Sequence, residues 1–315
     1  MTSKKLKIIS EKGDHTTNVV LKWLLKNNVV FNRVDCDEAI DFCIKIDNEE
    51  SSIKIDNGDY RVDEYWIRRG GFQFLTTKNR NSVFENYLKK EQIPVLSFIE
   101  KTMTEDDNLV GSYLEEKFNN KILNIKIASS LGLKIPETLI TNTKKELVSF
   151  FNLHTNIVSK CIYHDPNIQH NDYEYLNSGN QLVKEEQIQK LEEEFAPSIF
   201  QRYIEKKYEV RVFVFKDSLY SMAIFSQNDE KTKYDFRNYN KETPNRNIPY
   251  KLPKKITKKI MRFMKVKNMN SGSIDLIVDK KNDFYFLEIN PQGQIDWLSI
   301  NCNYYIEKSI AENYF

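Results

Sequence analysis

Apolar and polar positions at the start of the chain follow the order that a β-α-β unit requires. Residues 5–10 form a short apolar run, residues 15–28 place apolar side chains at helical spacing, and residues 29–35 form a second run. A strand, a helix and a second strand in succession are typical of a small parallel sheet. The pattern therefore predicts an α/β protein that begins with such a sheet.

Two further signals complete the expected N-terminal domain, residues 1–105. The dipeptide Asn57-Gly58 is a strong hairpin-turn signal between two strand-like runs. Helical spacing then runs from about residue 80 to residue 103, and a break is predicted near Pro94 because proline removes a backbone donor.

The middle of the chain, residues 106–198, is expected to form a second domain. Helical periodicity precedes Gly132, and two further helices are predicted at residues 144–154 and 184–195. Residues 164–182 are polar with little periodicity, which predicts a long loop with some strand. Loops of this length often carry function.

A third domain is expected at residues 199–315, where the pattern changes to strands. A lysine-rich helix is predicted at 254–268, after a polar stretch, and a hairpin at 272–294 follows it. The chain is expected to end in a helix at 303–313. No internal repeat or low-complexity segment interrupts this order.

The predicted hairpin carries acids where a core strand pair would carry apolar residues. A four-residue turn at 280–283 pairs Ile277 with Phe286 and Asp275 with Glu288. Cross-strand partners on one face of a sheet have their Cβ atoms about 4.5–5.5 Å apart. The pairing therefore brings two carboxylates together.

Asn290 lies on the same face as Glu288, because side chains on a strand alternate with period two. Two carboxylates this close repel each other unless a cation lies between them. Carboxylate and amide oxygens suit Mg²⁺, which binds one or two protein carboxylates together with phosphates and water. The alternative is a register one residue away, with the acids facing solvent.

A nucleotide bound through this metal would need cations to hold its phosphates. The chain has 9 glycines and neither of the common glycine-rich phosphate loops. Lys160 lies among apolar residues of a predicted strand, and Lys121 opens a predicted helix, where a phosphate is favoured. Each also has a structural reading: Lys121 as a surface lysine, Lys160 with its ammonium reaching water, and Glu209 with Arg211 as an ion pair.

The order of these elements over about residues 108–300 resembles that of the ATP-grasp superfamily. The resemblance implies an α/β (α+β) fold in which a pre-ATP-grasp parallel-sheet domain precedes two lobes that enclose ATP. It implies that Asp275, Glu288 and Asn290 hold Mg²⁺. The residues that it assigns to ATP are Lys121, Lys160, the adenine hinge Gln201, Arg202, Tyr203 and Ile204, and the ribose-binding Glu209. At position 202 many relatives have Glu; because backbone carbonyls also read the adenine, we expect ATP binding to survive this departure.

Within the superfamily, the chain resembles the microviridin-type peptide maturases that make graspetides, in particular the grasp-with-spasm subgroup. The motifs that carry this resemblance are YEVRVFVF, YDFRNY, YWIRRGG and LEINPQGQIDWL. The resemblance implies a precursor peptide with a leader and a core rich in Thr, Asp and Glu. It also implies leader docking in the central domain and a homodimer.

The reaction that the resemblance implies is ATP-driven activation of a peptide Asp or Glu as an acyl phosphate. A Thr or Ser hydroxyl then closes an ω-ester, or a Lys amine closes an amide. Arginine is well shaped to hold the substrate carboxylate, and Arg211 and Arg237 are the candidates. Glu209 is an alternative base for the hydroxyl. His164 and His170 are also candidate bases, or exposed loop residues without a role.

Arg68 and Arg69 are the notable charges of the N-terminal domain. They follow a tryptophan at a predicted strand end. One reading has them meet an acidic substrate peptide across the cleft. The other has them pair with acids inside the domain.

Composition narrows the remaining classes of function. The 47 basic and 45 acidic residues give a net charge of +2, which argues against a nucleic-acid-binding protein, although residues 251–267 form a local lysine patch. The four cysteines form no C-x-x-C pair, so a zinc ribbon or a disulfide framework is not expected. No signal peptide or membrane-length apolar run is found, and a cytoplasmic location without membrane contact is expected.

Three other functions stay open at this point. One is an ATP-grasp ligase that joins a free amino acid or amine to a protein or small-molecule carboxylate. Another is a nucleotide-binding protein without catalysis. An RNA-binding module is the third, and the charge balance disfavours it.

Overall fold

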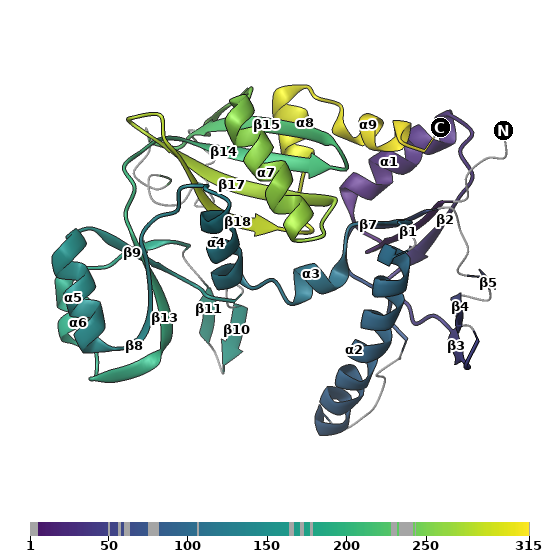
Figure 1. Cartoon of the computed structure of the whole chain (residues 1–315), viewed down its shortest axis with the longest axis horizontal. Helices are drawn as coiled ribbons and strands as arrows, with labels where there is room; N and C mark the ends of the chain where they lie inside the picture. The colour runs from purple at the N-terminus through teal and green to yellow at the C-terminus, as the bar shows by residue number, and fades with distance from the viewer. Residues whose placement is uncertain are drawn as a thin grey trace.

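The computed structural model describes most of the chain (Figure 1). Outside the description lie residues 1–5, 50, 56–57, 60–63, 75–81, 106, 164–166, 171–172, 177–178, 228–231, 233–241, 243 and 315. Only the backbone is described at residues 58–59, 82–83, 86, 167–170 and 173–176.

The N-terminal sheet is parallel, as the β-α-β pattern predicts. Its order is β2-β1-β6-β7, and every neighbouring pair is parallel. The strands are β1 (Leu6–Ser10), β2 (Phe31–Asp35), β6 (Glu64–Ile67) and β7 (Leu109–Val110). Helix α1 (His15–Lys26) joins β1 to β2 and begins at Asp14, whose carboxylate accepts a hydrogen bond from the Thr17 N–H at 2.8 Å.

A small antiparallel sheet and a long helix accompany the N-terminal sheet. The sheet consists of β3 (Phe42–Ile46), β4 (Ser51–Ile55) and β5 (Gly58–Asp59), with Ile55 opposite Gly58 at the predicted turn, of which Asn57 lies outside the described residues. Helix α2 (Ser82–Glu105) runs through Pro94, so the predicted break is wrong. The helix continues because the side chains after the proline, from Leu96 to Met103, bury an apolar face against the sheet.

The middle sheet is antiparallel and has the order β12-β9-β13-β8. Its strands are β8 (Thr138–Thr143), β9 (Ile157–Lys160), β12 (Gln181–Leu182) and β13 (Glu194–Arg202). The helices of this region are α3 (Tyr113–Lys117), α4 (Lys121–Ser130), α5 (Lys144–His154) and α6 (Glu185–Gln189). Strands β10 (Asn167–His170) and β11 (Tyr173–Leu176) pair as a hairpin, so the predicted loop contains strand.

One helix of the middle region is much shorter than its sequence predicts. The prediction was a helix over 184–195, but α6 ends at Gln189 and the chain enters β13 at Glu194. Pairing with β8 takes precedence over local helix propensity here. The predicted domain boundary at 198/199 falls within β13, and the division into three domains stays a prediction.

The C-terminal sheet has the order β16-β15-β14-β17-β18, and its neighbouring strands are antiparallel. Its strands are β14 (Lys206–Phe215), β15 (Ser218–Phe225), β16 (Arg246–Pro249), β17 (Ser271–Asp279) and β18 (Phe284–Asn290). The helices are α7 (Lys254–Val266), α8 (Asp296–Cys302) and α9 (Ile306–Glu312). The sequence pattern missed α8.

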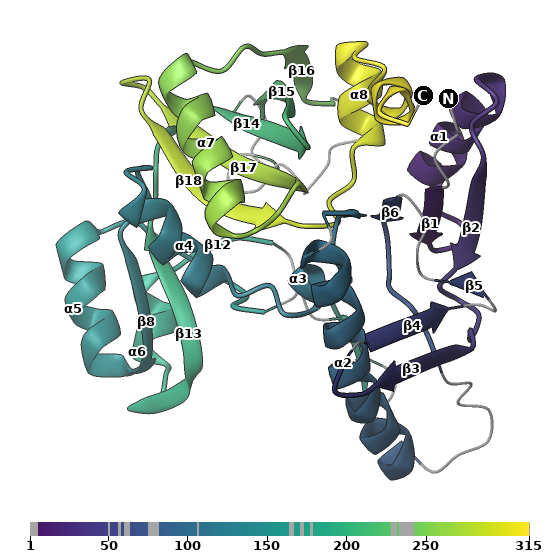
Figure 2. The ribbon, with the colours of Figure 1, turned by 45° about the vertical axis from the view of Figure 1, so that its right-hand side comes forward.

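The two faces of the C-terminal sheet have different partners. Val212 and Val214 pack on α7 through Ile260 and Phe263. On the other face, Phe213 and Phe215 share a core with α8, α9, α1 and β1. Figures 1 and 2 show the C-terminal helices beside α1, so the two ends of the chain are joined in one core.

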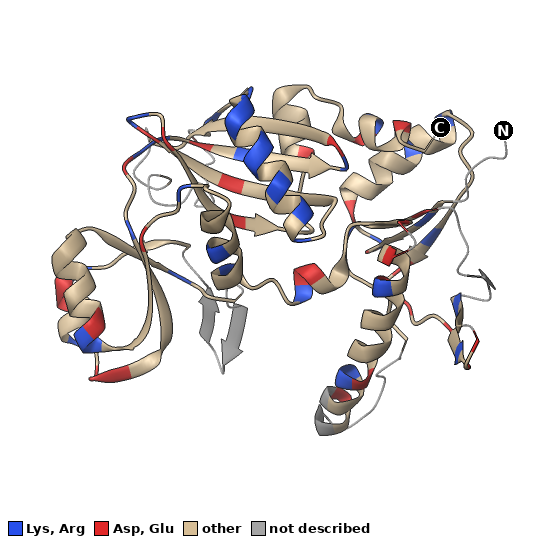
Figure 3. Cartoon of the chain, in the orientation of Figure 1, with Lys and Arg blue, Asp and Glu red and all other residues tan. Residues whose placement is uncertain are grey.

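Basic residues form a stripe of blue bands along the ribbon of α7 (Figure 3). They are Lys254, Lys255, Lys258, Lys259, Arg262 and Lys265. Because α7 covers the valine face of the sheet, this stripe lies on the side opposite the alternate residues Glu209 and Arg211. Separately, none of the helices in the described part of the chain is long and apolar enough to cross a membrane.

Glu100 is a buried acid on α2 that supports the start of α3. Its carboxylate accepts hydrogen bonds from the Ser112 hydroxyl at 2.6 Å and from the Tyr113 N–H at 3.2 Å. Burial raises the pKa of Glu100 from 4.5 to about 7, while these donors act in the opposite direction. The folded state therefore keeps a proton between about pH 4.5 and pH 7 that the unfolded chain has released.

This proton makes stability depend on pH. The contribution of Glu100 is fully present below about pH 4.5 and is lost as the pH rises through about 7, because the folded state binds more protons in that window. The change amounts to roughly 3 kcal/mol. The variant Glu100→Gln lacks this pH-dependent contribution to stability. We therefore expect the difference in unfolding free energy between variant and parent to change by about this amount between pH 5 and pH 8. Urea unfolding at the two pH values measures it. Parallel pH profiles for the two proteins would show that Glu100 keeps an ordinary pKa.

Candidate active site

A cleft of about 360 Å³ lies between the middle sheet and the C-terminal sheet. Strands β9 and β13 line one side, and β14, β17 and β18 line the other. Among its lining residues are Lys121, Lys160, Gln201, Arg202, Tyr203, Ile204, Glu209, Arg211, Asp275, Glu288 and Asn290. The structure thus brings together every residue that the sequence analysis assigned to nucleotide and metal.

The carboxylates meet at one end of the cleft. Asp275 on β17 lies directly opposite Glu288 on β18, as predicted. Nearer the turn the predicted register is wrong, because Phe286 pairs with Leu276 and not with Ile277. A β-bulge between Asp275 and Leu276 shifts the register by one residue and so restores the predicted pairing at the acids.

Asp275 is held by an arginine from the neighbouring strand. Arg211 Nη1 donates to both carboxylate oxygens, at 2.9 Å and 2.7 Å. The Asn290 amide donates to Asp275 Oδ2 at 3.2 Å. Both members of the ion pair are nearly buried, with side-chain exposures of 9% for Arg211 and 12% for Asp275. Arg211 therefore balances the charge of Asp275.

The second carboxylate faces a lysine from the other side of the cleft. Lys121 Nζ lies 3.8 Å from Glu288 Oε2 and also donates to the Cys161 carbonyl at 3.3 Å. Lys121 is the first residue of α4, which the Asn120 side chain caps. The Lys121 ammonium therefore places a positive charge at the cleft, which favours an anion there.

The far end of the cleft contains the segment predicted as an adenine hinge. The Gln201 amide donates to Thr138 Oγ1 at 2.9 Å, and the Tyr203 N–H donates to the Asn156 carbonyl at 2.9 Å. Arg202 points toward Glu137, with 3.7 Å between Nε and Oε1. These bonds fix the turn from β13 toward β14 and hold its backbone at the edge of the cleft.

Glu209 has a partner that the sequence analysis missed. It is buried on β14, where Lys206 contacts its carboxylate and the Ser226 hydroxyl donates to Oε1 at 2.8 Å. Residues three apart on a regular strand face opposite sides, but a bulge between Lys206 and Tyr208 brings Lys206 to the side of Glu209. Lys206 also lines the cleft.

The donor set at the carboxylate end suits magnesium. Two carboxylates and one amide meet there, all oxygen ligands on a pair of bonded strands. Within the described part of the chain, no group of three or more His, Cys, Asp and Glu side chains forms an alternative metal site. The fit therefore rests on Asp275, Glu288 and Asn290.

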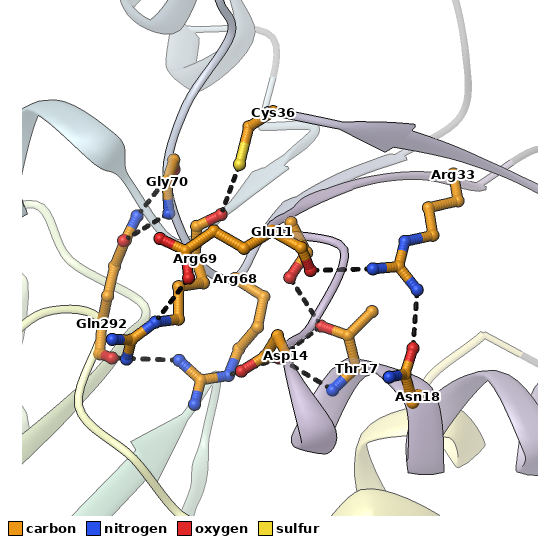
Figure 4. A network of polar contacts seen from close by, with 11 residues as sticks. Glu11, Asp14, Thr17, Asn18, Arg33, Cys36, Arg68, Arg69, Gly70 and Gln292 are labelled. Carbon is orange, nitrogen blue, oxygen red and sulfur yellow. Dashed lines mark hydrogen bonds and ion pairs between the residues drawn. The ribbon is translucent and has the colours of Figure 1, made fainter. Parts of the chain in front are cut away.

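Arg68 and Arg69 are not among the described residues that line this cleft. Arg68, directly after β6, is buried and donates to the Gln292 carbonyl, and Arg69 pairs with Glu11 at 3.1 Å (Figure 4). Arg69 thus pairs inside its own unit, the second of the two readings. Arg237 and His164 lie outside the described residues, as does the side chain of His170.

These features define an ATP-grasp fold, with two sheets enclosing a cleft that is lined by lysines and a D…E-x-N hairpin, and a parallel-sheet unit preceding them. Comparison with solved structures confirms the expected fold. The chain resembles an RiPP-associated ATP-grasp ligase of Chryseobacterium gregarium, solved with ADP and a leader and core peptide, at a TM-score of 0.81 and 25% identity, over 98% of this chain and 96% of that chain.

Two further structures are macrocyclases of Microcystis aeruginosa MRC. MdnC, bound with precursor peptide MdnA, has a TM-score of 0.77 and 25% identity over 98% of both chains. MdnB has a TM-score of 0.72 and 21% identity over 99% of both chains. No protein-family model and no curated protein sequence matches this chain.

Proposed function

We propose that the protein is an ADP-forming ATP-grasp ligase that macrocyclises a ribosomally made precursor peptide. The observation that carries the proposal is the convergence of two lysines, two carboxylates and an amide in one cleft of a chain that matches a macrocyclase over 98% of both lengths. The peptide substrate, with a leader and a core, follows from the complexes of the similar ligases. A homodimer and leader docking in the middle region belong to the same proposal.

The residues of the cleft divide between nucleotide and metal. Lys121 and Lys160 bind the phosphates, Gln201 to Ile204 hold the adenine, and Glu209 binds the ribose. Asp275, Glu288 and Asn290 hold Mg²⁺, which neutralises charge on the transferring phosphate. These positions place the phosphates at the carboxylate end of the cleft and the adenine at the hinge.

The reaction consists of two displacements. A carboxylate oxygen of a peptide Asp or Glu attacks the γ-phosphorus, the bond to the β-phosphate oxygen breaks, and ADP leaves. A Thr or Ser hydroxyl then attacks the acyl carbon, phosphate leaves with the former carboxylate oxygen, and the hydroxyl proton is lost. The peptide loses one water for each ester formed, and ATP becomes ADP and phosphate. With a Lys amine as the nucleophile, the same balance gives an amide.

Arginines hold the substrate carboxylate in this proposal. Arg211 is the described candidate, since it lies in the cleft and its Nη2 is not among the atoms bonded to Asp275. Arg237, His164 and His170 stay proposals for carboxylate binding and for the base, and Glu209 is a second candidate base.

Mass spectrometry of a co-expressed precursor peptide tests the function. We expect the peptide to lose the mass of one water per bond, with no residue added, and only when the ligase and its leader are present. Hydroxylamine treatment distinguishes esters, which it cleaves, from amides. A peptide that gains the mass of an amino acid would instead support the alternative, a ligase that joins a free amine to a carboxylate. An unchanged peptide with unchanged ATP would contradict both.

A further inference from the structure

Gln292 joins the metal end of the cleft to the N-terminal unit. It is two residues after Asn290, in the turn from β18 to α8, and is 8% exposed. Its side chain forms a reciprocal pair of hydrogen bonds with the backbone of Gly70: the Gly70 N–H donates to Oε1 at 2.9 Å, and Nε2 donates to the Gly70 carbonyl at 3.0 Å (Figure 4). The two residues are 222 positions apart in sequence.

The backbone of Gln292 is held from the same side. Its N–H donates to Glu116 Oε2 at 2.9 Å, and its carbonyl accepts from Arg68 Nη1 at 3.0 Å. Every hydrogen-bonding group of this residue, main chain and side chain, thus has a partner in the segment 68–116. Nε2 also donates to the Ser112 carbonyl at 3.4 Å. A single buried residue with five such bonds fixes the turn tightly.

Arg68 is buried to make its bond to this turn. Its Nε and Nη2 atoms are buried and have no hydrogen-bond partner among the described residues, and its nearest acid, Asp14, is 3.9 Å away from Nε. Burial lowers the pKa of Arg68, while the charge of Asp14 acts in the opposite direction. A buried arginine with unsatisfied donors is costly, and the bond that it does make is to the carbonyl of Gln292.

Gly293, the residue after Gln292, lies close to the Arg211 side chain. A Cβ atom built on Gly293 would lie 2.7 Å from Arg211 Nη2 and 2.8 Å from Ser273 Oγ. The turn backbone therefore limits where the Arg211 guanidinium can lie. A path of direct contacts leads from Gly70 through Gln292 and Gly293 to Arg211, and from there to Asp275.

We propose that Gln292 is a positioning residue through which the N-terminal unit sets the geometry of Arg211 and Asn290 at the metal end of the cleft. The proposal deepens the proposed ligase function and rests on it for the catalytic readout. The turn at residues 68–70 then acts on the site through Gln292 and does not itself contact nucleotide or metal. Of the two consecutive arginines, the buried one, Arg68, contributes to this support through its bond to Gln292.

The chain contains a matched control. Asn270 makes the same kind of reciprocal amide contact: the Gly111 N–H donates to Oδ1 at 3.0 Å, and Nδ2 donates to the Leu109 carbonyl at 2.6 Å. Asn270 also connects the C-terminal sheet to the N-terminal unit. It lies directly before the first residue of β17, whereas Asp275 lies further along that strand. Removing this contact weakens the same interface without reaching the site.

The test compares Gln292→Met with Asn270→Leu, two isosteric changes that remove an amide. We expect both to lower the melting temperature by similar amounts, because Asn270→Leu loses two hydrogen bonds across the interface and Gln292→Met loses the same kind of pair together with one longer bond at 3.4 Å. Only Gln292→Met is expected to lower kcat for peptide modification about 10–100-fold and to raise the Mg²⁺ concentration needed for half-maximal rate, as loss of support behind metal ligands does. Gln292→Leu, which also removes the amide, replaces Gln292→Met if the latter does not fold, with the same expected losses.

Calorimetric titration of Mg²⁺ with the ATP analogue AMPPNP separates this proposal from the proposed function. We expect Gln292→Met to bind the Mg²⁺-nucleotide more weakly than the parent and Asn270→Leu to bind it equally well, whether or not a peptide is ever modified. Equal losses of kcat and of nucleotide affinity in the two variants would overturn the positioning role. Parent-like values in Gln292→Met would overturn it as well.

Discussion

Glu288→Gln is expected to reduce peptide modification by about three orders of magnitude, while the protein stays folded. A bound Mg²⁺ contributes several kcal/mol of charge stabilisation at a transferring phosphate, and a loss of about 4 kcal/mol corresponds to roughly a 1000-fold decrease in rate. Glutamine has the shape of glutamate but lacks the charge that binds the metal. The rate of ADP release with precursor peptide measures the effect.

Stability should change little in Glu288→Gln. Glu288 and its neighbour Lys121 are both partly exposed, at 18% and 15%, and Lys121 keeps its bond to the Cys161 carbonyl. Asp283→Asn is the matched control, because Asp283 belongs to the same hairpin and pairs with Lys134 at 2.5 Å outside the cleft. The control should keep full activity. Normal product formation by Glu288→Gln would remove this residue from the metal site.

Asp275→Ala is expected to destabilise the fold as well as to stop the reaction. Arg211, at 9% side-chain exposure, would keep its charge without the carboxylate that it contacts at 2.7 Å. Breaking a buried ion pair by removing one partner typically costs about 3–5 kcal/mol. Urea unfolding of Asp275→Ala and of the parent should show a difference of this size, in contrast to Glu288→Gln.

A double variant shows whether the unpaired charge is the cause. Replacing a buried ion pair by apolar residues of similar volume is often neutral, so Arg211→Met combined with Asp275→Leu should recover much of the stability that Asp275→Ala loses, with no activity. If Asp275→Ala unfolds at the same urea concentration as the parent, then Asp275 is solvated and the buried pair contributes nothing.

The sequence predicted which acids of the hairpin face each other better than it predicted the register next to the turn. The oxygen-bearing residues and the pairing of Asp275 with Glu288 follow from period-two alternation, and the structure has that pairing. The pairing of Ile277 with Phe286 failed, because the strands next to the turn pair one residue away from the predicted register and a bulge compensates for this shift. Bulges leave no mark in an alternation pattern, and for the same reason Lys206 beside Glu209 was missed.

Contacts between distant segments were beyond the reach of sequence patterns. Arg68 pairs with Asp14 at 3.9 Å, an acid of its own region, as one reading expects, but no pattern indicates its hydrogen bond to a carbonyl 224 residues away. The break at Pro94 and the full length of the helix at 184–195 failed for a related reason, since burial of α2 and the pairing of β13 take precedence over local propensity. The parallel β-α-β start was predicted correctly, because the strands and the helix that define it are adjacent in sequence.

The most direct test of the account is a crystal structure with AMPPNP and Mn²⁺ in place of Mg²⁺, since Mn²⁺ is visible by its anomalous scattering. We expect an anomalous peak between Asp275 and Glu288 within bonding distance of Asn290, with the phosphates extending to Lys121 and Lys160 and the adenine at Gln201 to Ile204. A nucleotide bound elsewhere, or a cleft in which these carboxylates contact neither metal nor phosphate, would contradict it.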